Sequence, residues 1–249
     1  MPANTEHQKV TLITGASRGI GAACAKLFAE NDYAVCLNYL SNTAAAERVQ
    51  AEITDAGGLC VLMQADVSIA AEVQAMFASI DAQFGRLDVL VNNAGILETQ
   101  CRFSEITESR FRRIFETNVI SCFLCCQQAV QRMSSGGCIV NVSSMASKTG
   151  SPNEYIDYAT SKGAMDSLTI GLAKEVAAEG IRVNGVRPGL IYTDMHASGG
   201  EPGRVDRLKE RIPLQRGGQP SEIAEAIYWL ASENSSFVTG TFIDTSGGL

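Results

Sequence analysis

Several features are scarce or missing in this chain of 249 residues, which has two histidines and one tryptophan. No apolar run approaches the roughly 18 residues that a membrane-spanning helix needs. The opening residues MPANTEHQK lack the basic and then apolar pattern of a signal peptide. The formal net charge is −7, and no run of lysine and arginine offsets it locally. We therefore expect a cytoplasmic protein with no membrane or nucleic-acid partner.

Cysteine is present but follows no disulfide pattern. The eight cysteines are scattered through a long chain without a secretory signal, which predicts free thiols in a reducing compartment. Cys122, Cys125 and Cys126 form a cluster that suggests a metal site, but no second thiol pair or nearby histidine completes four ligands. We interpret the cluster as buried helix packing and predict no metal.

Strand-like and helix-like segments alternate along the chain. Hydrophobic residues make up 45% and charged residues 19%, as in ordinary globular proteins. The strand-like runs occupy residues 9–14, 34–39, 60–65, 87–93, 138–144, 181–189 and 241–248, with helical periodicity between them. This alternation predicts parallel βαβ units. We expect one α/β domain over residues 1–249, a Rossmann-type doubly wound sheet of about seven parallel strands with helices on both faces.

Two long irregular segments, residues 96–107 and 192–213, each follow a predicted strand. Open α/β sheets bind ligands beyond the carboxyl ends of their strands, so both segments are expected to border a substrate pocket. The second is rich in glycine near residue 200 and then becomes charged and helical, which favours a mobile lid. An idle surface loop is the alternative.

The segment TGASRGIG, residues 14–21, lies where the first strand gives way to a helix. Gly15, Gly19 and Gly21 permit a tight turn and a close backbone approach, so a pyrophosphate could bind against the start of the helix. A tight strand-to-helix turn alone would use the same residues. The position at the first βα junction favours the dinucleotide-binding interpretation.

The segment YATSK places Tyr158 and Lys162 one helical turn apart. A free tyrosine has a pKa of about 10, and a neighbouring positive charge favours its phenolate form. Lys162 could therefore bring Tyr158 towards working pH for proton transfer. The same spacing also arises by chance on solvated helices.

Taken together, these motifs resemble the short-chain dehydrogenase/reductase family. The matching segments are TGASRGIG, NNAG (residues 92–95), Asn118, NVSS (residues 141–144), YATSK and RPG (residues 187–189), and they span nearly the whole chain in the family's order. Within the family, the chain looks most similar to bacterial sugar-dehydrogenase-like and 3-oxoacyl-reductase-like members. The resemblance also implies a homotetramer, with residues 224–231 and the last strand near an interface.

The resemblance implies a catalytic tetrad of Asn118, Ser144, Tyr158 and Lys162. Tyr158 would donate or abstract the proton on the substrate oxygen, and Lys162 would lower the pKa of Tyr158 and bind the nicotinamide ribose. Ser144 would polarise the substrate carbonyl, with Ser143 as the alternative because strand alternation does not decide between them. Asn118 would hold a water in a proton relay. Bending of its helix is the other interpretation of Asn118.

The resemblance implies further cofactor contacts at the ends of several strands. Asp66 and Val67 would contact adenine, although Asp66 could instead cap a helix. The backbone of Ile191 and the hydroxyl of Thr193 would bind the nicotinamide carboxamide. The full predicted set is Gly15, Ser17, Arg18, Gly19, Ile20, Gly21, Asn38, Tyr39, Ser41, Asp66, Val67, Asn92, Ala94, Gly95, Tyr158, Lys162, Pro188, Gly189, Ile191 and Thr193.

The end of the second strand bears on which cofactor binds. An acidic residue there would accept hydrogen bonds from a free ribose 2′-hydroxyl, but this chain has Asn38, Tyr39, Leu40 and Ser41. With Arg18 as a candidate phosphate partner, NADP(H) is favoured over NAD(H), and use of both stays open. Pairing of Arg18 with a surface carboxylate is the alternative.

The predicted activity is hydride transfer between a nicotinamide and a carbonyl or secondary alcohol of a small sugar-like or 3-oxoacyl-like substrate. A non-catalytic NADP-binding sensor or scaffold is the alternative, and an epimerase or dehydratase is a third interpretation. The stretch of residues 204–211 is basic enough to meet an acidic substrate, yet interleaved acidic residues favour ion pairs on the helix surface.

Overall fold

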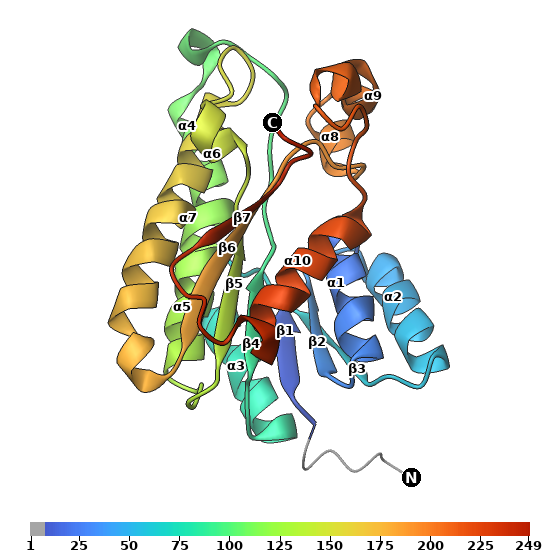
Figure 1. Ribbon diagram of the computed structural model, residues 1–249, viewed down its shortest axis with the longest axis vertical. Helices are drawn as coiled ribbons and strands as arrows, with labels where there is room; N and C mark the ends of the chain where they lie inside the picture. The colour runs from blue at the N-terminus through green and yellow to red at the C-terminus, as the bar shows by residue number, and fades with distance from the viewer. Residues whose placement is uncertain (1–7) are drawn as a thin grey trace.

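The computed structural model describes residues 8–249 and contains a seven-stranded parallel sheet (Figure 1). The strand order is β3-β2-β1-β4-β5-β6-β7. The strands are β1 (Val10–Ile13), β2 (Ala34–Tyr39), β3 (Cys60–Gln64), β4 (Val89–Asn92), β5 (Cys138–Val142), β6 (Arg182–Pro188) and β7 (Phe242–Thr245). Each lies inside the range expected from the sequence, and the predicted Rossmann-type fold is confirmed.

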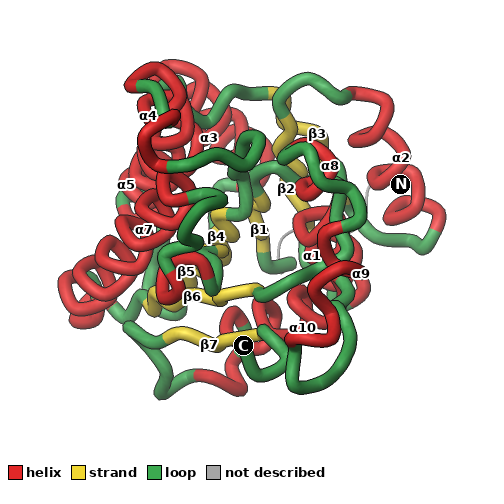
Figure 2. Tube along the Cα trace, turned by 90° about the horizontal axis from the view of Figure 1, so that it is seen from above, coloured by secondary structure: helices red, strands yellow, loops and turns green. Residues whose placement is uncertain are grey.

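Helices cover both faces of this sheet, as Figures 1 and 2 show from two directions. One face carries α1 (Gly19–Glu30), α2 (Thr43–Asp55) and α10 (Pro220–Ala231). The other carries α3 (Ala70–Phe84), α5 (Ser121–Val130) and α7 (Ile156–Glu175). The shorter elements are η2 (Phe103–Glu105), α4 (Glu108–Phe115), the π-helical turn η3 (Glu116–Ile120), α6 (Ala146–Thr149), η4 (Ala177–Glu179), α8 (Met195–Ser198), α9 (Arg204–Leu208), η5 (Lys209–Arg211) and η6 (Glu233–Ser235).

Two apolar cores lie on opposite sides of the sheet, because successive side chains of a strand point to opposite faces. In β1, Ile13 packs towards α1 and α10, whereas Leu12 packs towards α3 and α5. In β4, Val91 and Leu90 alternate in the same way. Both faces are buried, which explains the near-continuous apolar character of the strands.

The strand order reverses direction at β1, which pairs with β2 on one side and β4 on the other. Such a switch point opens a crevice at the carboxyl ends of the strands. The loops after β1, β4, β5 and β6 emerge at this edge, and α8 and α9 lie over it at the top of Figure 1. The motifs singled out in the sequence are thereby brought to one side of the sheet.

Residues 8–249 show neither a membrane-spanning helix nor a cluster of metal ligands. No helix in that range combines the length and the apolar character required to cross a membrane. In the same range, no three histidine, cysteine, aspartate or glutamate side chains are grouped as a metal site would require. Cys122, Cys125 and Cys126 are free thiols on α5, and their side chains are buried in the core, as the helix-packing interpretation predicts.

Candidate active site

The turn between β1 and α1 needs its glycines for conformation and for space. Gly15 and Gly19 have φ angles of +61° and +55°, in the left-handed region that favours glycine. A Cβ on Gly15 would lie 3.0 Å from the Cα of Ala94, and one on Gly21 would lie 2.6 Å from the Nδ2 of Asn93. The backbone of this turn is therefore bare and tightly held, as a phosphate cradle requires.

The first turn of α1 presents unpaired backbone N–H groups. Arg18 precedes the helix in an extended conformation, and no side chain caps the helix start. The first turn also carries no acidic residue that would compete for an anion. Ser17 lies just before the helix and Ile20 lies in its first turn, and both are partly exposed. These features fit the pyrophosphate of a dinucleotide.

Asn93 joins the glycine turn to the loop after β4, a role that the sequence analysis did not assign. Its Nδ2 donates to the carbonyls of Thr14 and Gly15 at 2.9 and 3.0 Å. The Oγ1 of Thr14 in turn accepts from the backbone N–H groups of Asn93 and Ala94, both at 3.0 Å. The two loops therefore form one rigid unit.

The neighbouring Asn92 has its side chain in the interior instead. It is 3% exposed, and its Nδ2 donates to the Oδ1 of Asn141 at 2.9 Å and contacts the Sγ of Cys126. Successive strand residues face opposite sides, so only one residue of the NN doublet can face the crevice. That alternation was the signal that could have singled out Asn93.

At the end of β2, the side chain of Asn38 is fully used in hydrogen bonds within the fold, and a cofactor contact at this residue stays a prediction. It is 1% exposed, with its Nδ2 donating to the carbonyls of Met63 and Ala65 and its Oδ1 accepting from the N–H of Gly15. Tyr39 likewise packs in the core beneath α1 and α2. The hydrogen bond from Gly15 to Asn38 thus holds the glycine turn against the end of β2.

The exposed groups near this strand end are Leu40, Ser41 and Arg18. Arg18 forms no ion pair with any residue in the range 8–249, so the alternative of a surface carboxylate partner finds no support there. After β3, the Oδ1 of Asp66 accepts from the N–H and Oγ of Ser68 at 2.9 and 2.6 Å. This is an Asx turn ahead of α3 rather than the helix cap named as the alternative for Asp66, because the N-cap of α3 is Ile69. Val67 beside Asp66 is buried.

Tyr158 and Lys162 occupy adjacent turns of α7 at the carboxyl edge of β5. The Nζ of Lys162 lies 5.6 Å from the centroid of the Tyr158 ring. The ammonium donates to the carbonyl of Val142 at 2.8 Å and contacts the Sδ of Met165 at 3.4 Å. Both side chains are buried, at 8% and 3% exposure. The pair expected from the sequence spacing is formed.

The acid–base properties of this pair differ from the sequence expectation. Burial raises the pKa of Tyr158 to about 12, although hydrogen bonding with Ser144 opposes the change. Burial also lowers the pKa of Lys162 to about 8. The ammonium is bonded to Val142 rather than to the phenol, so desolvation outweighs its pull on Tyr158. Tyr158 is thus a protonated acid at neutral pH.

The two serines after β5 lie in different surroundings. Ser143 is 2% exposed, and its Oγ donates to the backbone carbonyl of Lys162 at 3.3 Å. The Oγ of Ser144 accepts from the N–H of Ala146 at 3.1 Å and also interacts with Tyr158. Ser144 therefore lies on the side of the proton donor, whereas Ser143 holds the strand end against α7.

Asn118 lies within η3, where the helix widens into a π turn. It is fully buried, with its Oδ1 accepting from the N–H of Ile96 and its Nδ2 donating to the carbonyl of Ile96 and the Oγ of Ser161. A Cβ on Gly95 would lie 3.3 Å from the Oδ1 of Asn118 and 3.6 Å from the Nζ of Lys162. Helix distortion and polar anchoring therefore occur together at this residue.

The segment after β6 approaches the glycine turn from the other end of the chain. A Cβ on Gly19 would lie 3.4 Å from the Cγ2 of Thr193, so these residues are in contact. Pro188 accepts a hydrogen bond from the N–H of Met145, and Gly189 packs against the backbone of Ser246. Ile191 is buried at 4% exposure. The predicted nicotinamide-binding segment thus lies beside the predicted pyrophosphate-binding turn.

The segment 192–213 folds as α8, α9 and η5 over the carboxyl edge. Met195 packs on an apolar cluster that includes Leu97, Tyr155 and Tyr158. The basic residues of the segment are largely paired, with Arg204 and Arg207 on Glu201 and Lys209 on Asp206. Ion pairing therefore accounts for most of the basic stretch, as favoured above.

Comparison with known proteins agrees with this geometry. A family model described as enoyl-(acyl carrier protein) reductase matches residues 15–249. An uncharacterized oxidoreductase of Escherichia coli, YgfF, is 58% identical over 244 residues, covering 96% of this chain and 99% of the relative. The 3-oxoacyl-[acyl-carrier-protein] reductase FabG of Staphylococcus aureus is 39% identical over 247 residues, covering 97% and 98%.

Solved structures show the same relationship. A dehydrogenase/reductase of Sinorhizobium meliloti superposes with a TM-score of 0.91 at 34% identity, covering 98% of this chain and 97% of the other. A short-chain dehydrogenase of Burkholderia cenocepacia in complex with NADP superposes with a TM-score of 0.90 at 31% identity, covering 98% and 99%. This chain belongs to the short-chain dehydrogenase/reductase family. It is an oxidoreductase of that family with 3-oxoacyl-reductase-like relatives.

Proposed function

We propose that this protein transfers a hydride between NADP(H) and the carbonyl or secondary alcohol of a small substrate, with Tyr158 as the proton donor in reduction. The observation that carries the proposal is the buried Tyr158, which lies next to Ser144 and Lys162 on the crevice edge that holds the glycine turn. When bound, the nicotinamide would supply or accept the hydride.

Side chains of the protein would carry out the proton transfer. Tyr158 would give its Oη proton to the substrate oxygen as that oxygen gains negative charge, and Ser144 would donate a hydrogen bond to the same oxygen. Lys162 would place a positive charge beneath Tyr158, which stabilises the phenolate left behind. Asn118 would keep its π turn and the loop at Ile96 in register with this group.

The preference for NADP(H) is supported by Arg18, which is exposed beside the glycine turn and has no acidic neighbour at the end of β2. A guanidinium would bind a ribose 2′-phosphate through charge-assisted hydrogen bonds. The NADP complex of the Burkholderia relative is consistent with this preference. NAD(H) would bind the same site without that contribution.

A 3-oxoacyl-like substrate is supported by the names of the relatives and by the apolar cluster around Tyr158, whereas a sugar-like substrate rests on the family resemblance alone. The FabG relatives are named for reduction of a 3-oxoacyl group on acyl carrier protein. Leu97, Tyr155 and Met195 form an apolar wall beside Tyr158, which suits the carbon chain next to the reacting carbonyl. Residues 192–213 would act as the lid of this pocket.

Assembly and location are part of the same proposal. A cytoplasmic homotetramer would follow from family membership. Of the stretch 224–231 expected near an interface, Ile227 and Leu230 pack inside the chain, whereas Trp229 is 40% exposed. Strand β7 lies at the edge of the sheet, where another copy could approach. Light scattering of the purified protein tests the assembly.

The proposal is tested by following nicotinamide absorbance with NADPH and NADH in parallel. The panel would contain aldoses, polyols, diketones, simple aldehydes and a 3-oxoacyl thioester, with the Tyr158→Phe variant as the blank. Turnover that depends on Tyr158 and prefers NADPH is expected. Tight NADPH binding without turnover on any substrate would instead favour the alternative of a non-catalytic sensor.

A further inference from the structure

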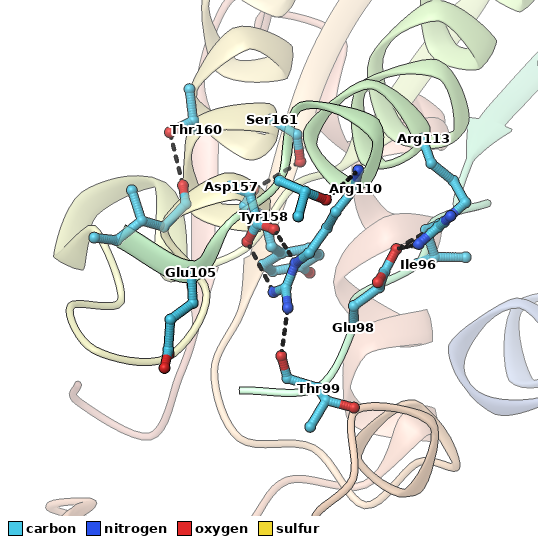
Figure 3. Close-up of polar contacts among 12 residues, drawn as sticks. Ile96, Glu98, Thr99, Glu105, Arg110, Arg113, Asp157, Tyr158, Thr160 and Ser161 are labelled. Carbon is cyan, nitrogen blue, oxygen red and sulfur yellow. Dashed lines mark hydrogen bonds and ion pairs between the residues drawn. The ribbon is translucent and has the colours of Figure 1, made fainter. Parts of the chain in front are cut away.

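Arg110 on α4 links three segments that surround the candidate catalytic tyrosine (Figure 3). Its Nε and Nη2 donate to the two carboxylate oxygens of Asp157, at 2.6 and 3.4 Å. Its Nη1 donates to the backbone carbonyl of Thr99 at 2.6 Å. One guanidinium thus holds the first turn of α7 and the loop after β4 at fixed positions.

Asp157 connects Arg110 to the backbone of Tyr158. The Oδ1 of Asp157 accepts the backbone N–H of Tyr158 at 2.9 Å, and the carboxylate is completely buried. A buried carboxylate needs a fixed positive partner, and Arg110, itself only 12% exposed, supplies it. The position of the backbone at Tyr158 therefore depends on a charge that α4 provides.

Thr99 connects Arg110 to the apolar cluster around Tyr158. It lies in the loop that carries Leu97, which packs against Tyr158 and Tyr155. A guanidinium has separate N–H groups for the carboxylate and for the carbonyl, whereas a lysine ammonium is a single point charge. An arginine is therefore suited to holding both partners at once.

We infer that Arg110 is a positioning residue, which fixes Tyr158 through Asp157 and fixes the substrate-side loop through the carbonyl of Thr99. The inference rests on the proposed function for its kinetic consequences. The two sets of hydrogen bonds should have different consequences. Those from Arg110 to Asp157 act on the proposed proton donor, and the one to the carbonyl of Thr99 acts on the apolar cluster beside it.

Arg113 provides a matched control on the same helix. It pairs with Glu98 in the same loop, and Figure 3 shows this pair separate from the Arg110 group. Its side chain is 57% exposed and has no bond to α7 in the described structure. Solvent screens such a pair, so its loss should have little effect on the site.

The kinetic test compares Arg110→Lys, the double variant Arg110→Met with Asp157→Asn, and Arg113→Lys. In the Arg110→Lys variant, KM should rise on the order of tenfold while kcat stays within about twofold, because the ammonium keeps the Asp157 pairing and releases Thr99. In the double variant, kcat should also fall on the order of 10- to 100-fold. NADPH affinity should be unchanged in all three variants, and Arg113→Lys should resemble the wild type.

Hydrogen exchange provides a readout that needs no turnover. Amides of residues 98–101 should exchange faster in both Arg110 variants, and those of residues 157–160 only in the double variant. Wild-type exchange in both segments of the double variant would overturn the inference, as would equal kinetic effects of Arg110→Lys and Arg113→Lys. A wild-type protein that binds NADPH without turnover would overturn the proposed function instead, and the exchange data would still decide the role of Arg110.

Discussion

Arg204 on α9 donates to both carboxylate oxygens of Glu154, in the loop just before α7, at 3.1 and 2.5 Å. The Arg204 side chain is 10% exposed, so this bidentate pair is largely shielded from water. The segment over the crevice is thereby attached to the loop that leads into Tyr158. Opening of this segment must break the pair.

Replacing Arg204 should loosen the segment over the pocket. In Arg204→Met, loss of hydrogen bonds to charged groups should weaken closure by about 1–3 kcal/mol, which raises KM on the order of tenfold. Steady-state kinetics and limited proteolysis within residues 195–211 measure the change. Arg207→Met is the control, because Arg207 is 51% exposed and also pairs with Glu201. Equal effects of the two substitutions would contradict the role assigned to Arg204.

The Tyr158→Phe substitution should remove the transferable proton and leave the fold intact. We expect a loss of about two to four orders of magnitude in rate, with NADPH affinity nearly unchanged. Kinetics and isothermal titration of NADPH measure the two quantities separately. Retention of full activity would exclude Tyr158 as the acid.

The pKa of Tyr158 has a consequence for alcohol oxidation, which needs the phenolate. Because burial holds this pKa at about 12, the phenolate fraction should grow about tenfold for each pH unit below that value. Oxidation should therefore accelerate steadily as the pH rises, whereas reduction, which uses the protonated phenol, should not. Initial rates in both directions across neutral and mildly alkaline pH test this, and an oxidation rate that levels off near neutral pH would contradict it.

Lys162 should reduce stability at neutral pH. Its pKa is lowered to about 8 in the folded protein, from 10.5, so the unfolded chain binds the proton more tightly. The destabilisation is therefore fully present below pH 8 and is relieved as the pH rises towards 10.5. Lys162→Met should raise the free energy of unfolding at pH 7 by roughly 2 kcal/mol, less than the full linkage because the carbonyl of Val142 loses its donor.

Urea denaturation of wild type and Lys162→Met at neutral and alkaline pH measures this effect. The stability difference should shrink at alkaline pH, while activity and NADPH affinity fall at every pH. A destabilised variant at pH 7 would mean that the ammonium is better solvated than its burial indicates.

Substitutions of Arg18 and of Asn38 should distinguish cofactor preference from the structural support of the glycine turn. Arg18→Leu should weaken NADPH binding on the order of tenfold and leave NADH binding unchanged, because only NADPH carries the 2′-phosphate. Asn38→Ala should lower the free energy of unfolding by about 2 kcal/mol by leaving buried carbonyls unpaired, without changing the NADPH-to-NADH ratio. Fluorescence titrations and urea denaturation test both expectations, and a changed NADPH-to-NADH ratio in Asn38→Ala would show that Asn38 contributes to cofactor selectivity.

Much of the fold could be predicted because it depends on local patterns. Apolar runs of strand length gave all seven strands, and TGASRGIG placed the glycine turn at the first βα junction. The contact between Tyr158 and Lys162 follows from helical spacing alone. Each of these features is encoded within a few neighbouring residues.

The remainder depends on contacts between distant segments. The pairs of Arg110 with Asp157 and of Arg204 with Glu154 join charges that no local pattern connects. The raised pKa of Tyr158 reflects how completely the surrounding loops exclude water, which helical spacing does not reveal. The hydrogen bonds of the Asn38 side chain to the carbonyls of Met63 and Ala65 likewise join segments that are distant in the sequence.

The contacts of Gly15 with Ala94 and of Gly19 with Thr193 bear on biosynthesis. The ribosome releases the glycine turn and the loop with Ala94 within the N-terminal half of the chain, but the segment with Thr193 emerges only after most of the chain has been made. A nascent N-terminal half would therefore contain the predicted phosphate-binding turn without its contact to Thr193. A bound dinucleotide should therefore stabilise complete, folded chains over truncated or partly folded ones, since only complete chains have the glycine turn in contact with the segment after β6.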